Sequence, residues 1–414
     1  MNGLKFSDSN PFNAPWILPS MAELRFQDFR FEEKEGNIRF HFLKLYYFDV
    51  PKDDFKKLGK VGVSETALIF QEAAQEAAER QFYRVLQRGF ERLTNKLTGN
   101  PTRYLHRNSG IPLIGALAFG IVDKGSDMIE VKPLTSCNAD CVFCSVDEGP
   151  SSKKKLDLVV EKDYLVQEVR KLLDFKQHPI HVYINPHGEP TLYADLVELV
   201  RDMSKTPFVA SIHLITNLAV VSKGMADKLI EAGLTNFNVS FHAVNPEQAK
   251  KLFHMPGYSV KKVMETLEHV RGRVKIILAP VYLQGVNEQD IEDIIKYAKQ
   301  QGFEVFIQNF LENRRGRNPV KELPFNKFSD FLKGLEKKHG LPLLKLGKVE
   351  STKEFPKPFK EGDTIEAEIW SEGRYRGEWY GKAKSRVLLI KGDYKKGKQK
   401  VKIARDAHNV FYAV

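Results

Sequence analysis

Three cysteines in one short stretch are the residues of this sequence best suited to hold a metal centre. Cys137, Cys141 and Cys144 are its three cysteines, separated by three and then two residues. Three thiolates on one loop favour a soft metal, as an iron–sulfur cluster or as zinc. A structural zinc ion would need a distant histidine as its fourth ligand, whereas a four-iron cluster would keep one iron open to a substrate. Three thiols that merely lie close together are the third alternative.

The cysteine spacing, with Phe143 just before the third cysteine, resembles the signature of the radical S-adenosylmethionine (radical SAM) superfamily. The resemblance implies that the three cysteines bind a 4Fe-4S cluster and that its open iron binds SAM. In that family the reduced cluster cleaves SAM to a 5′-deoxyadenosyl radical, which abstracts hydrogen from an unactivated carbon. The protein binds, orients and shields the reactants.

Strand and helix patterns alternate between residues 128 and 310. The strand pattern 128–132 leads into the cysteine loop, and five more strand patterns follow, most of them with a helix pattern behind them. This order predicts parallel strands joined by right-handed crossovers. The sequence therefore predicts an α/β fold whose centre is a partial (β/α)6 radical SAM barrel, with its chemistry at the carboxyl ends of the strands.

Two motifs after these strands resemble elements that bind SAM in the superfamily. The sequence His-Gly-Glu-Pro at 187–190 resembles the Gly-Gly-Glu motif that holds the amino group of SAM, although His187 stands where the family usually has glycine. The Thr-Asn pair at 216–217 resembles a Thr-Asn-Gly motif, with Leu218 in place of the glycine. A loop that simply turns into a helix is the alternative for 187–190.

Two later strand ends complete the expected SAM site. Ser240 and His242 resemble the element that meets the ribose or the SAM carboxylate, and a capped strand end is the alternative. Val281 resembles the residue that packs on the adenine. The residues that the resemblance assigns to SAM binding are Phe143, Gly188, Glu189, Asn217, Ser240, His242 and Val281.

Four segments are expected along the chain. Residues 1–125 predict an N-terminal α+β extension, with an irregular start over 1–20 and a long helix over 64–97 that begins at a Ser64 cap. Residues 126–346 are the predicted radical SAM barrel, 347–359 a linker containing two prolines, and 360–414 a small C-terminal β-barrel.

The C-terminal segment resembles a TRAM domain, an OB-like barrel that recurs in RNA-modifying enzymes. Thirteen Lys and Arg against eight Asp and Glu occur in residues 360–414, and aromatic residues lie between them. Aromatic faces can stack on bases while cations hold phosphates, but a solvated surface is the alternative. With the basic loop at 313–318, which could also be salt-bridged, the candidate RNA contacts are Arg314, Arg315, Arg317, Trp379, Lys382, Lys384 and Arg386.

Composition limits the setting of the protein. The chain has 64 Lys and Arg against 53 Asp and Glu, so its formal net charge is +11, which suits a polyanionic partner or a lysine-rich surface. No long apolar run and no signal-peptide pattern occur, so we expect no membrane span. Three clustered cysteines argue for a reducing cytoplasm.

The expected function is modification of an RNA nucleoside, in tRNA or rRNA, by a radical SAM enzyme that takes electrons from a donor such as ferredoxin or flavodoxin. No cysteine before Cys137 could hold the second cluster of a methylthiotransferase. A radical SAM enzyme for a protein or small metabolite is one alternative, and a zinc-stabilised RNA-binding protein is another. On this interpretation, deleting residues 360–414 should leave uncoupled SAM cleavage largely intact but abolish activity on an RNA substrate.

Overall fold

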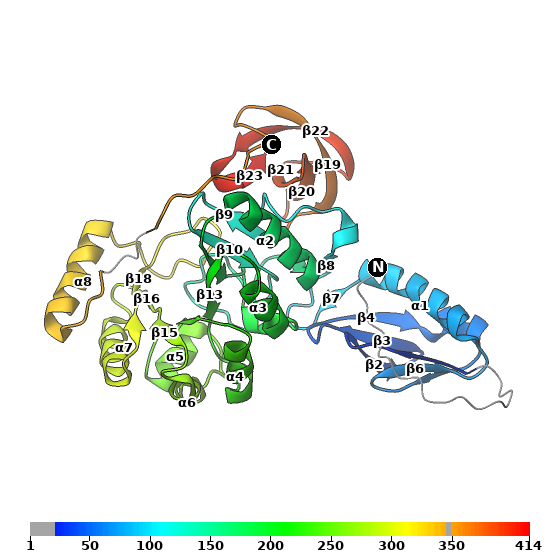
Figure 1. Cartoon of the computed structure of the whole chain (residues 1–414), viewed down its shortest axis with the longest axis horizontal. Coiled ribbons are helices and arrows are strands. Elements are labelled where there is room, and N and C mark those ends of the chain that lie inside the picture. Colours follow the sequence, from blue (N-terminus) through cyan, green and yellow to red (C-terminus); the bar gives the residue numbers. More distant parts are fainter. Residues whose placement is uncertain (1–20, 345–348) are drawn as a thin grey trace. The chain divides into compact units, whose positions relative to one another are not determined.

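The computed structural model describes residues 21–344 and 349–414, which belong to two compact units. The first unit ends at Tyr104, and the second runs from Leu105 to Val414 (Figure 1). The expected irregular start at 1–20 and residues 347–348 of the expected linker lie outside the described residues. The domain boundaries expected from the sequence stay predictions.

The first unit combines two antiparallel sheets with one helix. One sheet has the order β2-β3-β4-β7 and the other β1-β6-β5. In β3 every second side chain is buried, including Phe40 and Phe42, so the alternating pattern places aromatic rings in the core. The elements are β1 (Ala22–Arg25), β2 (Phe29–Lys34), β3 (Asn37–Phe42), β4 (Tyr46–Pro51), a 3-10 helix (Lys52–Leu58), β5 (Val61–Val63), β6 (Ala67–Phe70), α1 (Gln75–Phe90) and β7 (Thr94–Asn95).

The long helix expected over 64–97 is wrong. Residues Ala67–Phe70 form β6, which pairs with β1 and β5, and the helix begins after Ala74. Ser64 does not cap a helix, because its hydroxyl accepts a hydrogen bond from the Ala67 backbone N–H across a turn. Strand pairing on both sides outweighs the helix propensity of this segment, as tertiary context often does.

The second unit is built on a seven-stranded sheet with the order β17-β15-β14-β13-β12-β10-β9. Six strands are parallel and the edge strand β9 is antiparallel to β10, so the predicted α/β order of six parallel strands is confirmed. The strands are β9 (Gly120–Asp123), β10 (Met128–Lys132), β12 (Ile180–Ile184), β13 (Val209–Thr216), β14 (Asn236–Val239), β15 (Lys275–Leu278) and β17 (Glu304–Val305).

Helices between the strands cover this sheet (Figure 1). Ile180, Val182 and Ile184 of β12 are fully buried, and so are Leu165 and Val169 of α2. The helices are α2 (Lys162–Lys176), α3 (Leu196–Ser204), α4 (Lys223–Glu231), α5 (Pro246–Phe253), α6 (Val260–Val270), α7 (Glu288–Gln301) and α8 (Phe325–His339). Short elements are β8 (Thr102–Leu105), β11 (Asp157–Val160), β16 (Val281–Tyr282), β18 (Gln308–Asn309) and 3-10 helices at Arg107–Ser109 and Pro190–Leu192.

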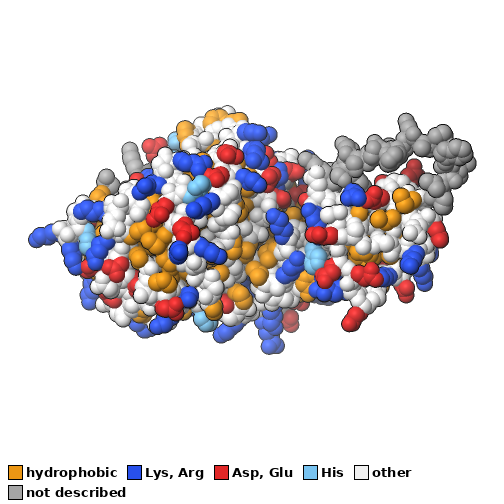
Figure 2. Space-filling view, turned by 90° about the horizontal axis from the view of Figure 1, so that it is seen from below, with side chains coloured by type: hydrophobic (Ala, Val, Ile, Leu, Met, Phe, Trp, Pro, Cys, Tyr) orange, Lys and Arg blue, Asp and Glu red, His pale blue; other side chains and the backbone are white. Residues whose placement is uncertain are grey.

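The surface carries charges of both signs. On the face in Figure 2, Lys and Arg side chains are interspersed with Asp and Glu. Many of them form exposed pairs, such as Lys275 with Glu304 at 2.9 Å. Within residues 21–344 and 349–414, every helix is too short or too polar to span a bilayer.

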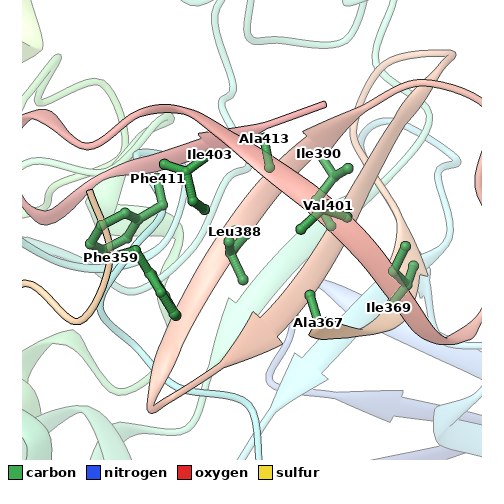
Figure 3. Close-up of a cluster of buried hydrophobic side chains, with 9 residues drawn as sticks. All are labelled: Phe359, Ala367, Ile369, Leu388, Ile390, Val401, Ile403, Phe411 and Ala413. Carbon is green, nitrogen blue, oxygen red and sulfur yellow. The ribbon is translucent and has the colours of Figure 1, made fainter. Parts of the chain in front are cut away.

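The C-terminal barrel of the second unit closes through five strands in the order β19-β20-β21-β23-β22, so a small barrel is confirmed there. Its strands are β19 (Thr364–Glu372), β20 (Glu378–Ala383), β21 (Arg386–Lys391), β22 (Gly397–Arg405) and β23 (Phe411–Ala413), with a 3-10 helix at Ala407–Asn409. Its core is shown in Figure 3 and consists of Phe359, Ala367, Ile369, Leu388, Ile390, Val401, Ile403, Phe411 and Ala413.

Candidate functional site

One cavity of about 360 Å³ lies where the sheet strands end and is lined by all three cysteines. Its walls include residues that terminate or directly follow parallel strands, such as Asn185 after β12, Thr216 at the end of β13 and Ser240 after β14. This position is where parallel α/β sheets place their ligands. All seven residues that the sequence assigned to SAM binding line the same cavity. We call it the cofactor cavity.

Backbone hydrogen bonds hold the cysteine loop against the end of α5. The N–H groups of Asp140 and Val142 donate to the carbonyls of Phe253 and Leu252 at 3.1 and 3.0 Å. These contacts hold the cysteine loop, which follows β10, against the connection between β14 and β15. They fix the backbone of the loop. The cysteines therefore have a defined arrangement before any ligand binds.

The chemistry of the cysteine side chains fits an iron–sulfur cluster. The three thiols are half-buried, and the Glu148 N–H donates to Cys144 Sγ at 3.3 Å. Burial raises the pKa of the Cys137 and Cys141 thiols, so their thiolates would need the positive charge of bound iron. Three soft ligands facing one cavity match a cluster with one iron not bound by the protein. Among the described residues, no three His, Cys, Asp or Glu side chains converge as ligands of a single ion.

Glu189 connects the ends of two strands beneath this cavity. Its Oε1 accepts hydrogen bonds from the Thr216 hydroxyl at 2.6 Å and from both the hydroxyl and N–H of Thr191. Its Oε2 accepts from the Asn217 N–H at 2.8 Å. Burial raises the pKa of this carboxyl, while the hydrogen bonds oppose the shift. With one donor on Oε2, this oxygen keeps a lone pair for an ammonium group.

Gly188 lies where two segments of backbone meet. A Cβ built on it would lie 2.2 Å from the Ser136 carbonyl oxygen, and the next N–H, of Glu189, donates to the same oxygen at 2.8 Å. A larger residue would push the loop 187–190 away from the residue that precedes Cys137. The glycine of this motif is therefore needed for close approach of the backbone.

Asn217 and Leu218 preserve the geometry of the motif despite the missing glycine. The Asn217 amide donates to the Asn138 side chain at 2.8 Å, which links β13 to the cysteine loop. Leu218 has a φ of 58°, a left-handed conformation that costs a non-glycine residue about 1–2 kcal/mol. The buried Leu218 side chain thus keeps the backbone shape that a glycine would adopt freely.

His242 lies between aromatic rings at the edge of the cofactor cavity. Its ring meets the Phe143 ring edge to face, with the centroids 4.7 Å apart, and Phe253 lies on another side at 4.8 Å. Burial lowers the pKa of His242 to about 3, so the ring is neutral and its Nδ1 accepts the Val281 N–H at 3.3 Å. His242 therefore supports Val281, the residue expected to contact adenine.

The sequence did not identify Asn287 as part of this site. Its buried amide donates to the Val281 carbonyl at 2.9 Å, and its Oδ1 accepts from the Leu283 N–H at 2.7 Å. These bonds fix the backbone on the side of Val281 away from His242. Its position just before α7 is an available but weak signal, because asparagine is common at helix starts.

Arg317 braces the cysteine loop. Its guanidinium donates to Asp147 at 2.9 Å, to Asp140 at 3.0 Å and to the Cys141 carbonyl at 3.2 Å. Its backbone N–H donates to the Cys144 carbonyl at 2.9 Å. The sequence placed this arginine among the RNA contacts, and that role stays a prediction, but its donors are directed to the cysteine loop.

We expect Arg317→Lys to weaken retention of the cluster by roughly 10- to 100-fold, the usual effect of losing a residue that orients metal ligands. A lysine cannot supply the planar fork that reaches both aspartates at once. Iron content after anaerobic incubation with a chelator measures the effect. Arg314→Lys, at an exposed neighbouring position, is the control. Equal iron loss in wild type and in the Arg317 variant would contradict the bracing role.

A buried charge cluster joins the cysteine loop to the C-terminal barrel. Arg374 of the barrel contacts Glu148 at 3.0 Å and Asp157 at 3.2 Å, and Lys154 contacts Glu148 at 2.6 Å. All four side chains are buried. Burial raises the pKa of Glu148 and lowers that of Lys154 to about 8. Because Glu148 is four residues after Cys144, the barrel is anchored next to the cofactor cavity.

The loop residues assigned to RNA binding differ in their surroundings. Arg314 is exposed, as is Lys384 of the barrel. Arg315 forms an ion pair with the buried Glu378, and its guanidinium lies 4.5 Å from the centre of the Tyr375 ring. Arg315 therefore packs against the barrel.

The side chains of three other candidate RNA contacts already form hydrogen bonds within the second unit. Arg386 is buried and donates to the Pro356 carbonyl at 2.6 Å. Lys382 is half-buried and donates to a carbonyl outside the barrel, and Trp379 donates to a turn carbonyl. RNA contact by all seven residues stays a prediction, and the exposed Arg314 and Lys384 are the freest of them to meet a phosphate.

Comparisons with known proteins find a matching family and several relatives of this chain. The sequence model of the radical SAM superfamily matches residues 131–298. An uncharacterized protein of Methanocaldococcus jannaschii is 32% identical over 329 residues, which cover 72% of this chain and 76% of that protein. GTP 3′,8-cyclase of Listeria welshimeri is 29% identical over 189 residues, 44% of this chain and about half (54%) of the cyclase. The solved structure of Streptococcus suis SuiB bound to S-adenosylmethionine is 12% identical, with a TM-score of 0.42 over 77% of this chain and 71% of that one.

Proposed function

Because the chain belongs to the radical SAM superfamily, we propose that it is an enzyme that modifies a nucleoside of tRNA or rRNA. Members of this superfamily bind a 4Fe-4S cluster and SAM, and these are the cofactors of the protein. Together they supply a 5′-deoxyadenosyl radical that can abstract hydrogen from a substrate carbon.

The observation that supports this assignment most is the shared cavity. Three cysteines and seven other residues, which follow five different strands, face one space, although up to 144 positions separate them. In our proposal Cys137, Cys141 and Cys144 bind the cluster, and Glu189 Oε2 accepts a hydrogen bond from the amino group of SAM. The remaining cavity residues orient the adenosine and exclude water.

The case for RNA rests on the C-terminal barrel. It is a closed five-stranded barrel with an excess of cations, and its sequence resembles a TRAM domain. Arg314 and Lys384 are exposed cations that suit phosphate contacts. Recognition would then depend on these placed cations and on contacts to the bases. A one-electron donor such as ferredoxin or flavodoxin would reduce the cluster.

The second candidate is a radical SAM enzyme that acts on a small metabolite, in particular a free nucleotide. One observation favours it: the chain is 29% identical over 189 residues to a protein named for cyclising GTP. The two candidates share the cofactor cavity and differ in whether the base arrives within an RNA chain.

Comparison of nucleosides from total RNA with and without the gene tests the proposal. We expect one modified nucleoside to disappear from the deletion strain and to return when the intact gene is supplied. Mass spectrometry of digested tRNA and rRNA fractions gives the answer and the RNA class. An unchanged nucleoside profile, together with a changed pool of free nucleotides, would reject the RNA substrate in favour of the metabolite.

A further inference from the structure

A second, smaller cavity of about 150 Å³ lies next to the cofactor cavity. The two cavities share Ser145 and Val146, the two residues after Cys144, as lining residues. His187 lines the second cavity, while the next residue, Gly188, lines the first. The two cavities are therefore neighbours. They meet at residues 145–146 on one side and at residues 187–188 on the other. We call the second space the barrel cavity.

The C-terminal barrel supplies seven of the fifteen residues that line this cavity. Tyr375, Tyr380, Leu389 and Tyr412 line it, and the segment at 116–118 covers another side. Tyr380 is held in place by edge-to-face contact with one ring and stacking on another. The wall is thus mainly aromatic and apolar. A cavity of about 150 Å³ is large enough to hold one benzene ring.

The charged groups that line the barrel cavity are balanced by partners. Arg315 is paired with Glu378, which is also in the lining. Arg374 and Lys154 are paired with Glu148 and with a second buried carboxylate. Three cations thus face three carboxylates. Together these six groups carry no net charge that would attract a phosphate into the cavity. A neutral group therefore fits the cavity better.

His187 gives the cavity a polar group that is available to a ligand. The structure shows no hydrogen bond of its ring to any other described residue. Burial, together with the nearby charges of Lys132, Arg374 and Lys154, lowers the pKa of His187 well below its usual value. The ring is therefore neutral and offers one donor and one acceptor. This is also the residue that replaces the usual glycine of the superfamily motif.

We propose that the barrel cavity receives the base of the substrate nucleoside, with His187 hydrogen-bonded to the edge of the base and the barrel tyrosines against its face. A nucleobase is neutral, planar and able to form hydrogen bonds on its edge, so it matches each feature of the lining. This inference rests on the proposed function and names the part of the substrate that this chain recognises. It also gives the barrel a direct role in the substrate site.

Filling the cavity tests the inference. Leu389 is half-buried and lines the cavity, so Leu389→Trp should occupy the space that the base needs. Thr364→Trp adds the same bulk at an exposed position on β19 and is the matched control. The cluster-loaded enzyme with SAM is titrated with adenosine, guanosine, cytidine and uridine, and binding is followed by saturation-transfer NMR. We expect wild type and the control to bind at least one nucleoside, and Leu389→Trp to bind it at least about tenfold more weakly.

A second variant keeps the test decisive if Leu389→Trp does not fold or loses its iron. His187→Gly restores the glycine of the superfamily motif and removes the polar contact, so it should also weaken nucleoside binding about tenfold. Unchanged affinity in the folded variants, or no nucleoside binding by wild type, would overturn the inference. Such failures differ from a failure of the proposed function. Suppose that wild type binds a nucleoside, that Leu389→Trp does not, and that the deletion strain has normal RNA. The assignment of the cavity would then stand, and the substrate would be a free nucleoside or nucleotide.

Discussion

Arg374→Ala should destabilise the protein by about 3–5 kcal/mol, the usual cost of leaving a buried ion pair without one partner. Arg374 is 3% exposed, and its guanidinium contacts Glu148, Asp157 and the Leu156 carbonyl. In its absence Lys154 would have to neutralise Glu148 alone, and Asp157 would lose the guanidinium while keeping the hydrogen bond from the Thr135 hydroxyl.

The same substitution should reduce the iron content of the protein. Glu148 donates its N–H to Cys144 Sγ, so a shift of the Glu148 side chain, then paired with Lys154 alone, would disturb the cysteine loop. Thermal unfolding and iron analysis of anaerobically prepared protein measure the two effects. Arg376→Ala is the control, because Arg376 is exposed two positions away. A melting temperature and iron content equal to those of Arg376→Ala would show that the charge cluster is dispensable.

The buried arginine changes what is expected of a truncated protein. From the sequence, removal of residues 360–414 should spare SAM cleavage, because the barrel reads as an independent module. In the structure the truncation removes Arg374 and leaves Glu148 and Asp157 buried without it. We therefore expect the truncated protein to lose cluster and SAM cleavage together. Retention of both would favour the modular interpretation.

Cys141→Ala should abolish both the cluster and the formation of 5′-deoxyadenosine. Each thiolate is one of three proposed protein ligands, and burial raises the pKa of the Cys141 thiol, so a bound cation would be needed to hold it as a thiolate. Loss of a ligand should lower SAM cleavage by more than the roughly 10- to 100-fold seen when supporting residues are changed.

Anaerobic absorbance and mass spectrometry of the dithionite-reduced reaction check this prediction. Val142→Ala is the matched control, because it shortens the neighbouring side chain and keeps the N–H that donates to the Leu252 carbonyl. Iron and 5′-deoxyadenosine should be present in the control and absent from the cysteine variant. Zinc in place of iron in the control and in wild type would instead support a structural metal.

The seven residues that the sequence assigned to SAM binding line one cavity because they follow strands. Parallel strands end at one edge of a sheet, so a cysteine loop after β10 and polar residues after β12, β13 and β14 had to meet. Leu218, which stands where the motif has glycine, takes a left-handed conformation that glycine adopts readily. Here local pattern and topology point to the same geometry.

Contacts across long stretches of sequence left no comparable signal. Arg317 is 170 positions from Asp147, and Arg374 is 226 positions from Glu148. Each looks like an ordinary basic residue in the sequence, since residue type does not reveal burial. The same reason explains why Arg386 was grouped with surface cations although it lies inside. In residues 67–70, pairing with the adjacent strand β5 and with the more distant strand β1 overrode a local helix preference.

The buried pair of Arg374 and Glu148 also constrains how the gene can evolve. The two side chains lie more than 200 positions apart in the sequence, yet loss of either one would remove a charged partner of the other in the interior. We expect the two positions to covary among orthologues, with the arginine absent wherever the acid is replaced. If this barrel were fused to another catalytic core, that core would need an acidic residue at the position of Glu148 to pair with Arg374. Recombination at the linker alone would therefore yield few viable chimeras.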